Sequence, residues 1–194
     1  MVIPAGILQD PFYDEHRSIA WNLGAIGCVL SHEMTHGFDK EGKEYDPAGF
    51  QKRWWTRTDN RNYNLQTKAL IELYSKQRIS GFPVSGKRTL SENIADLGGM
   101  GIALDALHKK LDSIKLTGDE RKQMYRDFFT GYATSWRMKD KKKKRIQALI
   151  MDRHAPPVLR VNLIVSQFQE WYDAFDVKEG DDLYTPPEKR IRIF

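Results

Sequence analysis

The chain has 194 residues, with 31 Lys and Arg against 26 Asp and Glu, which leaves a formal net charge of +5. This length suffices for one domain with a substantial core, and the small charge excess indicates solubility more than an anionic partner. The only cysteine, Cys28, excludes an internal disulfide framework, and its apolar surroundings predict a buried thiol. The longest apolar run, residues 23–30, is too short to cross a membrane, and residues 1–11 do not have the pattern of a signal peptide.

The first predicted element is a short strand over residues 2–8. Its apolar residues favour a strand, and Pro4 suits an edge position, where no backbone N–H is needed. The strand is expected to remain unpaired or to pair between two chains, which leaves a dimer as one option.

The second predicted element is a helix that begins at Ser18, a good N-cap, and runs to about Gly37. On such a helix His32 and His36 lie four residues apart on one face, where two imidazoles can bind one metal ion. Glu33 lies beside them. This His-Glu-Met-Thr-His run matches the H-E-x-x-H arrangement of zinc peptidases, in which the glutamate serves as general base. The alternative is an accidental match.

A catalytic zinc needs a third protein ligand and an open position for water. Glu92 and Asp96 are spaced one turn apart at the start of a further predicted helix that runs to about Leu111. From there Glu92 can reach the metal, while Asp96 can accept a hydrogen bond from a ligating imidazole. Asp39 can do the same for His36. The alternative is that both acids only favour a helix N-terminus.

The region between these helices is predicted from its turn and cap residues. Asp46 followed by Pro47 predicts an N-cap and first helical position. The segment after it is expected to be helical to Ile79, with a polar interruption near residues 59–60. Residues 80–89 form a loop by composition.

The last third of the chain is also predicted to be helical. Thr117 to Glu120 has the capping-box pattern, and the apolar stripe that follows every fourth residue, ending at Trp136, indicates core. The basic run Lys141 to Arg145 is typical of a solvated helix face; the alternative is a nucleic-acid patch, against which the lack of interleaved aromatic residues argues. A final helix is expected over Asn162 to Phe175.

Two motifs together resemble one protein family. The stretches 31–39, Ser-His-Glu-Met-Thr-His-Gly-Phe-Asp, and 91–99, Ser-Glu-Asn-Ile-Ala-Asp-Leu-Gly-Gly, are similar to those of the neprilysin family of zinc metallopeptidases, and residues 3–9, 54–55 and 154–160 agree with it. The resemblance implies a mainly α (α+β) fold, the thermolysin-like gluzincin catalytic subdomain, built as a helical bundle. It also implies that residues 1–194 are the carboxy-terminal part of a larger metalloendopeptidase.

The resemblance further implies the roles of individual residues. His32, His36 and Glu92 would bind one Zn²⁺ per chain, supported by Asp39 and Asp96. Glu33 would take a proton from zinc-activated water, His154 would stabilise the oxyanion and Arg160 would bind a substrate carbonyl. An apolar pocket is expected for the residue on the amino-group side of the cleaved bond, the residue that directly follows this bond. The positions expected to form it are the following: Ile7, Phe12, Cys28, Val29, Ser135 and Trp136.

The expected substrates are short oligopeptides, and the expected partner is the missing amino-terminal part of the same peptidase. Without that part the chain is expected to bind zinc but to hydrolyse peptides poorly. The alternatives are a non-catalytic zinc-binding or partner-binding module and, much less favoured, a nucleic-acid binder. The final residues, which lack a cysteine, point to a bacterial relative and leave the cytoplasm and the cell envelope or periplasm open.

Overall fold

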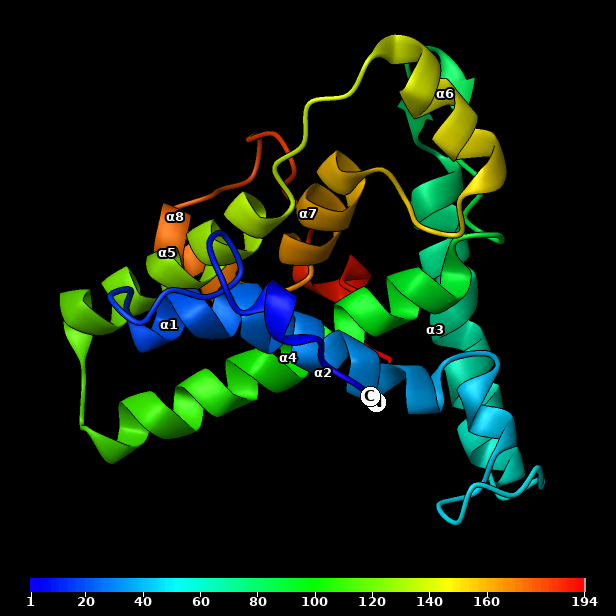
Figure 1. The fold of residues 1–194 in the computed structure, drawn as a ribbon, viewed down its shortest axis with the longest axis horizontal. Coiled ribbons are helices and arrows are strands. Elements are labelled where there is room, and N and C mark those ends of the chain that lie inside the picture. Colours follow the sequence, from blue (N-terminus) through cyan, green and yellow to red (C-terminus); the bar gives the residue numbers. More distant parts are fainter. Residues whose placement is uncertain (194) are drawn as a thin grey trace.

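The computed structural model describes residues 1–193 and is mainly helical. Within these residues eight α-helices are joined by 3₁₀ turns, one π-helical turn and loops, and the one sheet is a small antiparallel hairpin (Figure 1). The elements are α1 (Ile19–Asn22), α2 (Cys28–Thr35), α3 (Arg57–Ser75), β1 (Arg78–Ile79), β2 (Phe82–Pro83), α4 (Leu90–Ser113), α5 (Gly118–Ser135), α6 (Lys142–Met151), α7 (Pro157–Val165) and α8 (Gln169–Phe175). The predicted mainly α class is confirmed.

The helix that carries the H-E-x-x-H motif is continuous in space but changes its winding. Ser18 caps it, because its side-chain oxygen accepts a hydrogen bond from the backbone N–H of Trp21 at 3.1 Å. Between α1 and α2 the residues Leu23–Gly27 form a π-helical turn, and there the N–H of Ile26 donates to the carbonyl of Phe12 at 2.9 Å. A 3₁₀ turn, His36–Phe38, ends the helix. The predicted span from Ser18 to about Gly37 is confirmed.

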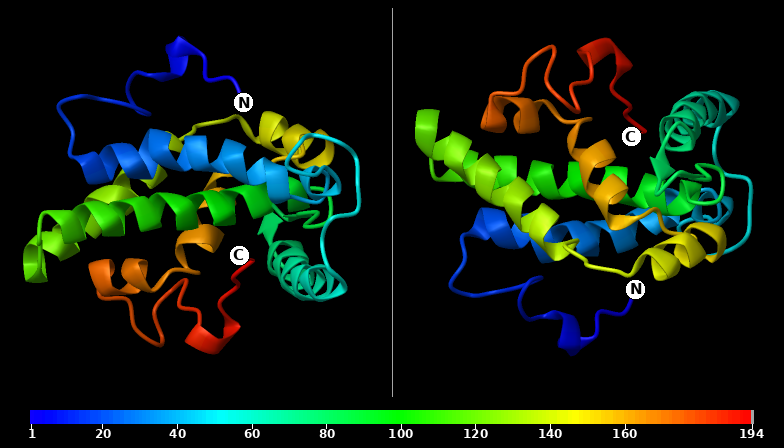
Figure 2. Two further views of the ribbon diagram at one scale, coloured as in Figure 1. Left: turned by 90° about the horizontal axis from the view of Figure 1, so that it is seen from below. Right: turned by 90° about the horizontal axis from the view of Figure 1, so that it is seen from above.

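The motif helix lies antiparallel to α4, so the end of α2 meets the start of α4 (Figures 1 and 2). This is the most extensive helix–helix contact among the described residues. Gly99 makes it possible: a Cβ atom at that position would lie 2.6 Å from the backbone nitrogen of His32. The close approach places the first turn of α4 beside both histidines of the motif.

Replacement of Gly99 by alanine is therefore expected to push α4 away from α2. We expect a loss of about 1–3 kcal/mol in the free energy of unfolding, since the overpacked atom is backbone and cannot rotate away, together with weaker metal binding. Gly101→Ala is the matched control, because its added Cβ meets only a ring atom of Phe168 at 3.8 Å. Urea unfolding of both variants measures the difference. Equal stabilities would contradict the tight contact.

Helix α5 packs against the other side of the motif helix, and the core lies between these layers. Gly24 allows this contact, since a Cβ there would lie 1.9 Å from the carbonyl oxygen of Phe128. Phe128 and Tyr132 of the predicted stripe are buried, which confirms its core position, and Cys28 is buried as predicted. Thr117 occupies the N-cap position of α5, although its side chain caps no backbone N–H.

The prediction of an edge strand over residues 2–8 is wrong. Residues Ala5–Ile7 form a 3₁₀ turn instead, closed by hydrogen bonds to the carbonyls of Pro4 and Ala5. A strand needs a neighbour that fills its ladder of hydrogen bonds, and the hairpin β1–β2, the only sheet within residues 1–193, already pairs with itself. The N-terminal segment instead lies on the face of the α2–α4 layer opposite the C-terminal segment (Figure 2).

The predicted helix start at Asp46 is also wrong. The Asp46 side chain accepts hydrogen bonds from the N–H groups of Ala48 and Phe50, and Gly49, at a φ of 82°, closes a turn. The helix begins after Thr56, where Thr56 and Asp59 form a capping box. Residues 80–89 contain β2 as well as the predicted loop.

The predicted helix over 162–175 is two helices, α7 and α8, which are separated at residues 166–168. The buried side chain of Gln167 interrupts it, since its amide donates to Leu163 and Ser166 while its oxygen accepts the N–H of Ile191. The basic run Lys141 to Arg145 is exposed at the start of α6, as predicted. Within residues 1–193 no helix combines the length and the apolar character that a bilayer span requires.

Candidate metal centre

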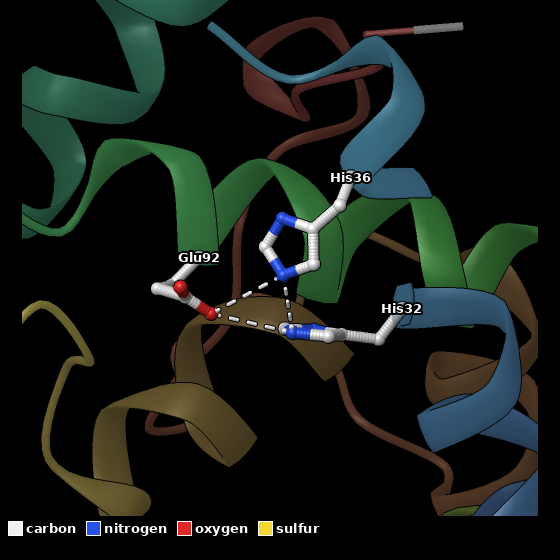
Figure 3. Close-up of side chains that lie close together, drawn as sticks. All are labelled: His32, His36 and Glu92. Atoms are coloured by element: carbon white, nitrogen blue, oxygen red, sulfur yellow. Dashed lines mark hydrogen bonds and ion pairs between the residues drawn. The ribbon is translucent and has the colours of Figure 1, made fainter. Parts of the chain in front are cut away.

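Three side chains from the α2–α4 contact converge on one point (Figure 3). His32 comes from the last turn of α2, His36 from the 3₁₀ turn that follows, and Glu92 from the first turn of α4. The Nε2 atoms of the two histidines are 3.1 Å apart. Glu92 Oε2 lies 3.3 Å from His32 Nε2 and 3.6 Å from His36 Nε2. The sequence-predicted ligand set is therefore brought together, although its residues come from separate helices.

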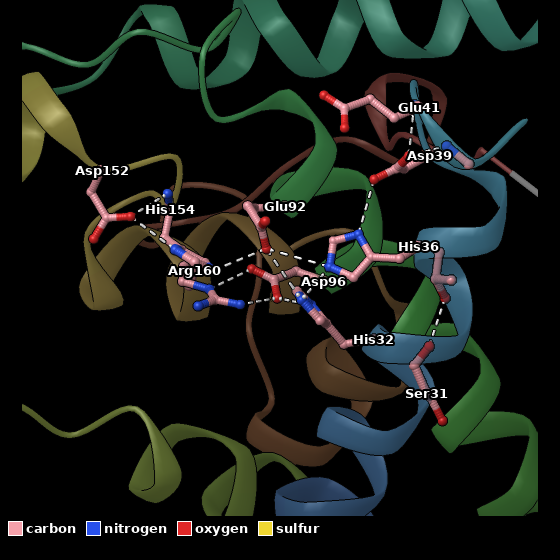
Figure 4. A network of polar contacts seen from close by, with 12 residues as sticks. Ser31, His32, His36, Asp39, Glu41, Glu92, Asp96, Asp152, His154 and Arg160 are labelled. Carbon is pink, nitrogen blue, oxygen red and sulfur yellow. Dashed lines mark hydrogen bonds and ion pairs between the residues drawn. The ribbon is translucent and has the colours of Figure 1, made fainter. Parts of the chain in front are cut away.

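The other nitrogen of each imidazole contacts a carboxylate (Figure 4). His32 Nδ1 lies 2.8 Å from Asp96 Oδ1, and His36 Nδ1 lies 2.9 Å from Asp39 Oδ2. A carboxylate only accepts, so each Nδ1 carries the proton. In the neutral imidazoles both Nε2 atoms then present lone pairs toward each other and toward the Glu92 carboxylate. Such an arrangement lacks a donor and calls for a cation.

The separations fit a zinc ion. Tetrahedral ligands at about 2.0–2.1 Å from zinc lie about 3.3 Å from one another, close to the three distances given above. Glu92 Oε2 is buried, and no hydrogen bond of ordinary geometry reaches it from the described residues. A buried carboxylate oxygen without a donor is costly unless a charge meets it. The donor set of two imidazoles and one carboxylate is one that zinc prefers.

Without a metal, the pKa values of these groups favour charged imidazoles beside a charged carboxylate. The hydrogen bond of His36 to Asp39 and its close approach to Glu92 raise the pKa of His36 to about 10. Burial works against the charge on His32, but its hydrogen bond to Asp96 and its close approach to Glu92 still raise its pKa. Burial likewise opposes the charge on Glu92, yet the neighbouring imidazoles of His154, His32 and His36 hold its pKa well below the ordinary value.

Zinc binding is therefore expected to release protons and to strengthen as the pH rises. The metal binds only neutral imidazole, and the histidines are protonated below their raised pKa values. Each displaced proton should change the apparent affinity by up to about tenfold per pH unit. Calorimetric titrations at pH 6, 7 and 8, in buffers of different ionisation enthalpy, measure both effects. An affinity that is constant over this range would show that no proton is displaced.

His154 lies at the edge of the same cluster. Its Nε2 is 3.1 Å from Glu92 Oε2, and its Nδ1 is 2.8 Å from Asp152 Oδ1. Its close approach to Glu92 raises the pKa of His154 most, and the hydrogen bond to Asp152 adds to the rise despite partial burial. Sequence reasoning missed Asp152, although an acid two residues before a candidate histidine was a usable signal.

Arg160 is held in place by three contacts. Its guanidinium donates to both carboxylate oxygens of Asp96, from Nε at 2.7 Å and from Nη2 at 2.6 Å, and stacks 3.7 Å from the ring centre of Trp136. Only 5% of Arg160 is exposed. Asp96 therefore links Arg160 to His32, so one buried carboxylate orients both groups.

Three of the six positions predicted for an apolar pocket border one cavity. A cavity of about 110 Å³ is bordered by Cys28, Val29, Trp136 and Glu33, together with His32, His154 and Arg160. Ile7, Phe12 and Ser135 do not line it. Tyr132 does, and its hydroxyl donates to the carbonyl of Arg160 at 3.0 Å. Its spacing in the sequence predicts only a core position for Tyr132, because it is the same as that of its buried neighbours.

The helical fold, the H-E-x-x-H motif and the glutamate of the antiparallel neighbour are typical of gluzincin metallopeptidases. A sequence model of Peptidase family M13 matches residues 1–191, and the chain belongs to this family. It is similar to the neutral endopeptidase of Lactococcus lactis subsp. cremoris, with 39% identity over 194 residues that cover 100% of this chain. It is also similar to human endothelin-converting enzyme 1, with 36% identity over 97% of this chain.

Solved structures agree with the sequence relatives. The crystal structure of PepO from Lactobacillus rhamnosis HN001 matches 97% of this chain with a TM-score of 0.88 and 38% identity. The zinc metalloprotease Zmp1 of Mycobacterium tuberculosis, in complex with an inhibitor, matches 98% with a TM-score of 0.88 and 40% identity. The chain spans only 29% of the Lactococcus relative, 25% of the human one, and 29% and 30% of the two structures.

Proposed function

We propose that the chain is the carboxy-terminal, zinc-binding catalytic part of a longer metalloendopeptidase. The observation that carries this proposal is the meeting of two imidazole nitrogens and one carboxylate oxygen within 3.1–3.6 Å of one another, with no donor between them. His32, His36 and Glu92 would hold Zn²⁺, while Asp96 and Asp39 fix the two imidazoles. When bound, zinc supplies a Lewis acid and lowers the pKa of a bound water molecule.

Glu33 is the proposed general base. It follows His32 directly, is exposed and borders the cavity beside the metal cluster. A carboxylate in this place can accept a proton from the attacking water and pass it to the departing amide nitrogen. Because Glu33 is not one of the three proposed metal ligands, its carboxylate is available to transfer the proton.

His154 is the proposed donor to the developing oxyanion. With Asp152 accepting at Nδ1, the charged imidazole keeps a second N–H at Nε2, which faces the cluster. Arg160 is the proposed substrate clamp. Its Nε and Nη2 are held by Asp96, and Nη1, which bonds to no other described residue, is left to donate to a peptide carbonyl.

The proposed substrates are short oligopeptides with an apolar residue on the amino-group side of the cleaved bond, directly after this bond. Cys28, Val29 and Trp136 supply the apolar wall for that side chain. We further propose that turnover requires the amino-terminal part of the peptidase, since the chain spans 29% of the Lactococcus relative. The isolated chain is expected to bind zinc but to hydrolyse peptides poorly.

Glu33→Gln tests this function against a purely structural metal site. The substitution should leave about one zinc per chain, because residue 33 is not among the proposed ligands. Any hydrolysis of hydrophobic peptides of three to ten residues should fall by at least about a hundredfold. Elemental analysis and chromatographic peptide assays on both proteins give the answer. No zinc in either protein would overturn the proposal, and undiminished hydrolysis by the variant would overturn the role of Glu33.

A further inference from the structure

Two cavities lie on different sides of the metal cluster. The first is the 110 Å³ cavity that contains His32, His154 and the apolar wall. The second, of about 360 Å³, is bordered by His36 and Glu92 and by residues 39–42, 87, 88, 90 and 91. The two cavities have no lining residue in common, and the consecutive residues Arg153 and His154 border the second and the first, respectively. In the view of Figure 4, His154 lies on one side of Glu92 and Asp39 on the other.

The second cavity, here called the basic cavity, carries an excess of positive charge. Four of its lining residues are cations, namely Lys40, Lys87, Arg88 and Arg153. Within residues 1–193 none of the four has a carboxylate at ion-pair distance. Arg88 donates one hydrogen bond, to the carbonyl of Ile150.

The acidic groups of the basic cavity, Asp39, Glu41 and Glu92, offset part of this charge but are fewer than the cations, and two of the three are engaged with other groups. Asp39 accepts from His36 and from the N–H groups of Glu41 and Gly42, so its oxygens are occupied. Glu92 faces three imidazoles. Only the exposed Glu41 remains as a free carboxylate among the lining residues. Several arginines and lysines that line one cavity without carboxylate partners can bind a carboxylate group of a ligand.

We infer that the basic cavity binds an acidic side chain, Asp or Glu, of a peptide on the carbonyl side of the bond to be cleaved. This inference rests on the proposed function, which places the residue after the cleaved bond, on its amino-group side, in the apolar cavity. The metal cluster connects the two cavities, because His32 borders the first while His36 and Glu92, whose facing atoms lie 3.1 and 3.3 Å from His32 Nε2, border the second. An extended peptide that crosses the cluster from the apolar cavity is therefore expected to place one of its next residues at the basic cavity. The chain would thus prefer peptides that are acidic before the cleaved bond and apolar after it.

The test uses the zinc-loaded 194-residue chain and a matched pair of phosphinic pseudopeptides. In both compounds Ala directly precedes the phosphinic group, which stands in place of the cleaved bond, and Phe directly follows it. The residue before Ala is either Glu or Gln. The Glu compound is expected to bind about fivefold to tenfold more tightly in calorimetry at low salt, and the ratio should shrink at 0.5 M NaCl. A third compound, in which the Glu follows Phe instead of preceding Ala, should show no such gain in affinity.

Charge removal in the basic cavity provides the second arm. In the double variant Lys87→Gln/Arg153→Gln the Glu-to-Gln affinity ratio should fall to near one. Lys109→Gln/Lys110→Gln, which removes the same charge from exposed residues at the far end of α4, should leave the ratio as it is. A ratio near one in the unmodified chain, with tight zinc-dependent binding of the Gln compound, would overturn this inference and leave the proposed function standing. If neither compound binds to the zinc-loaded chain, the proposed function fails and the inference falls with it.

Discussion

Glu92→Gln is expected to lower the affinity for zinc on the order of a thousandfold. The variant keeps the size and the helix of Glu92 but replaces the charged oxygen that meets His32 Nε2 at 3.3 Å with a neutral amide. Metal sites with several protein ligands distribute about 10–16 kcal/mol of binding energy among them, so the loss of one anionic ligand removes several kcal/mol. Competition titration with a chromophoric chelator measures the affinity.

Glu33→Gln is the matched control for this experiment. It is the same chemical change on a carboxylate that directly follows a proposed ligand, yet it should leave the zinc affinity nearly unchanged. His32→Ala gives a second comparison and should lose zinc as Glu92→Gln does. If Glu92→Gln retains zinc as tightly as the unmodified chain, Glu92 is not a ligand, and the third ligand must come from a different residue.

The parts of the site that follow from local spacing were predictable from the sequence. His32 and His36 need only a helix to share a face, and Asp39 follows within one turn of the second histidine. Glu92 is different, because its approach depends on the packing of α4 against α2, which Gly99 permits. The downstream acid pair indicated it only in combination with the histidine pair, and the family resemblance agreed.

The errors in the predicted fold arise where one sequence pattern is compatible with two different local structures. Asp followed by Pro starts a helix or a turn equally well, and at Asp46 the left-handed Gly49 and the side-chain hydrogen bonds favour the turn. The N-terminal apolar residues resemble a strand, but strands depend on partners that no local pattern supplies. The break between α7 and α8 follows from the contact of Gln167 with Ile191, which is a tertiary contact.

Asp96→Asn is expected to cost about 3–5 kcal/mol of stability, because it leaves the Arg160 charge buried and unpaired. Only 4% of Asp96 and 5% of Arg160 are exposed, and the guanidinium donates twice to this carboxylate. Burial opposes the charge on Asp96, but Arg160 and His32 hold its pKa below the ordinary value. The contribution of this group is therefore present above the unfolded-state pKa and is lost as the pH falls through the folded-state pKa.

Asp112→Asn is a suitable control for that substitution. Asp112 pairs with Arg121 at 2.7 Å, but 68% of its side chain is exposed, so its loss should cost about 1 kcal/mol or less. Urea unfolding of the two metal-free variants gives the comparison. Equal losses would show that the buried pair is no more important than the exposed one.

Asp96→Asn, compared with a variant of Arg160, separates two roles of Asp96. The carboxylate also accepts from His32 Nδ1 at 2.8 Å, which fixes the imidazole that we propose as a ligand. Loss of such a partner typically weakens metal binding by about 10–100-fold. Arg160→Met, which leaves the Asp96–His32 contact in place, should destabilise the fold with a smaller loss of zinc affinity. If both variants lose zinc affinity in proportion to stability, Asp96 acts on the metal site only through the fold.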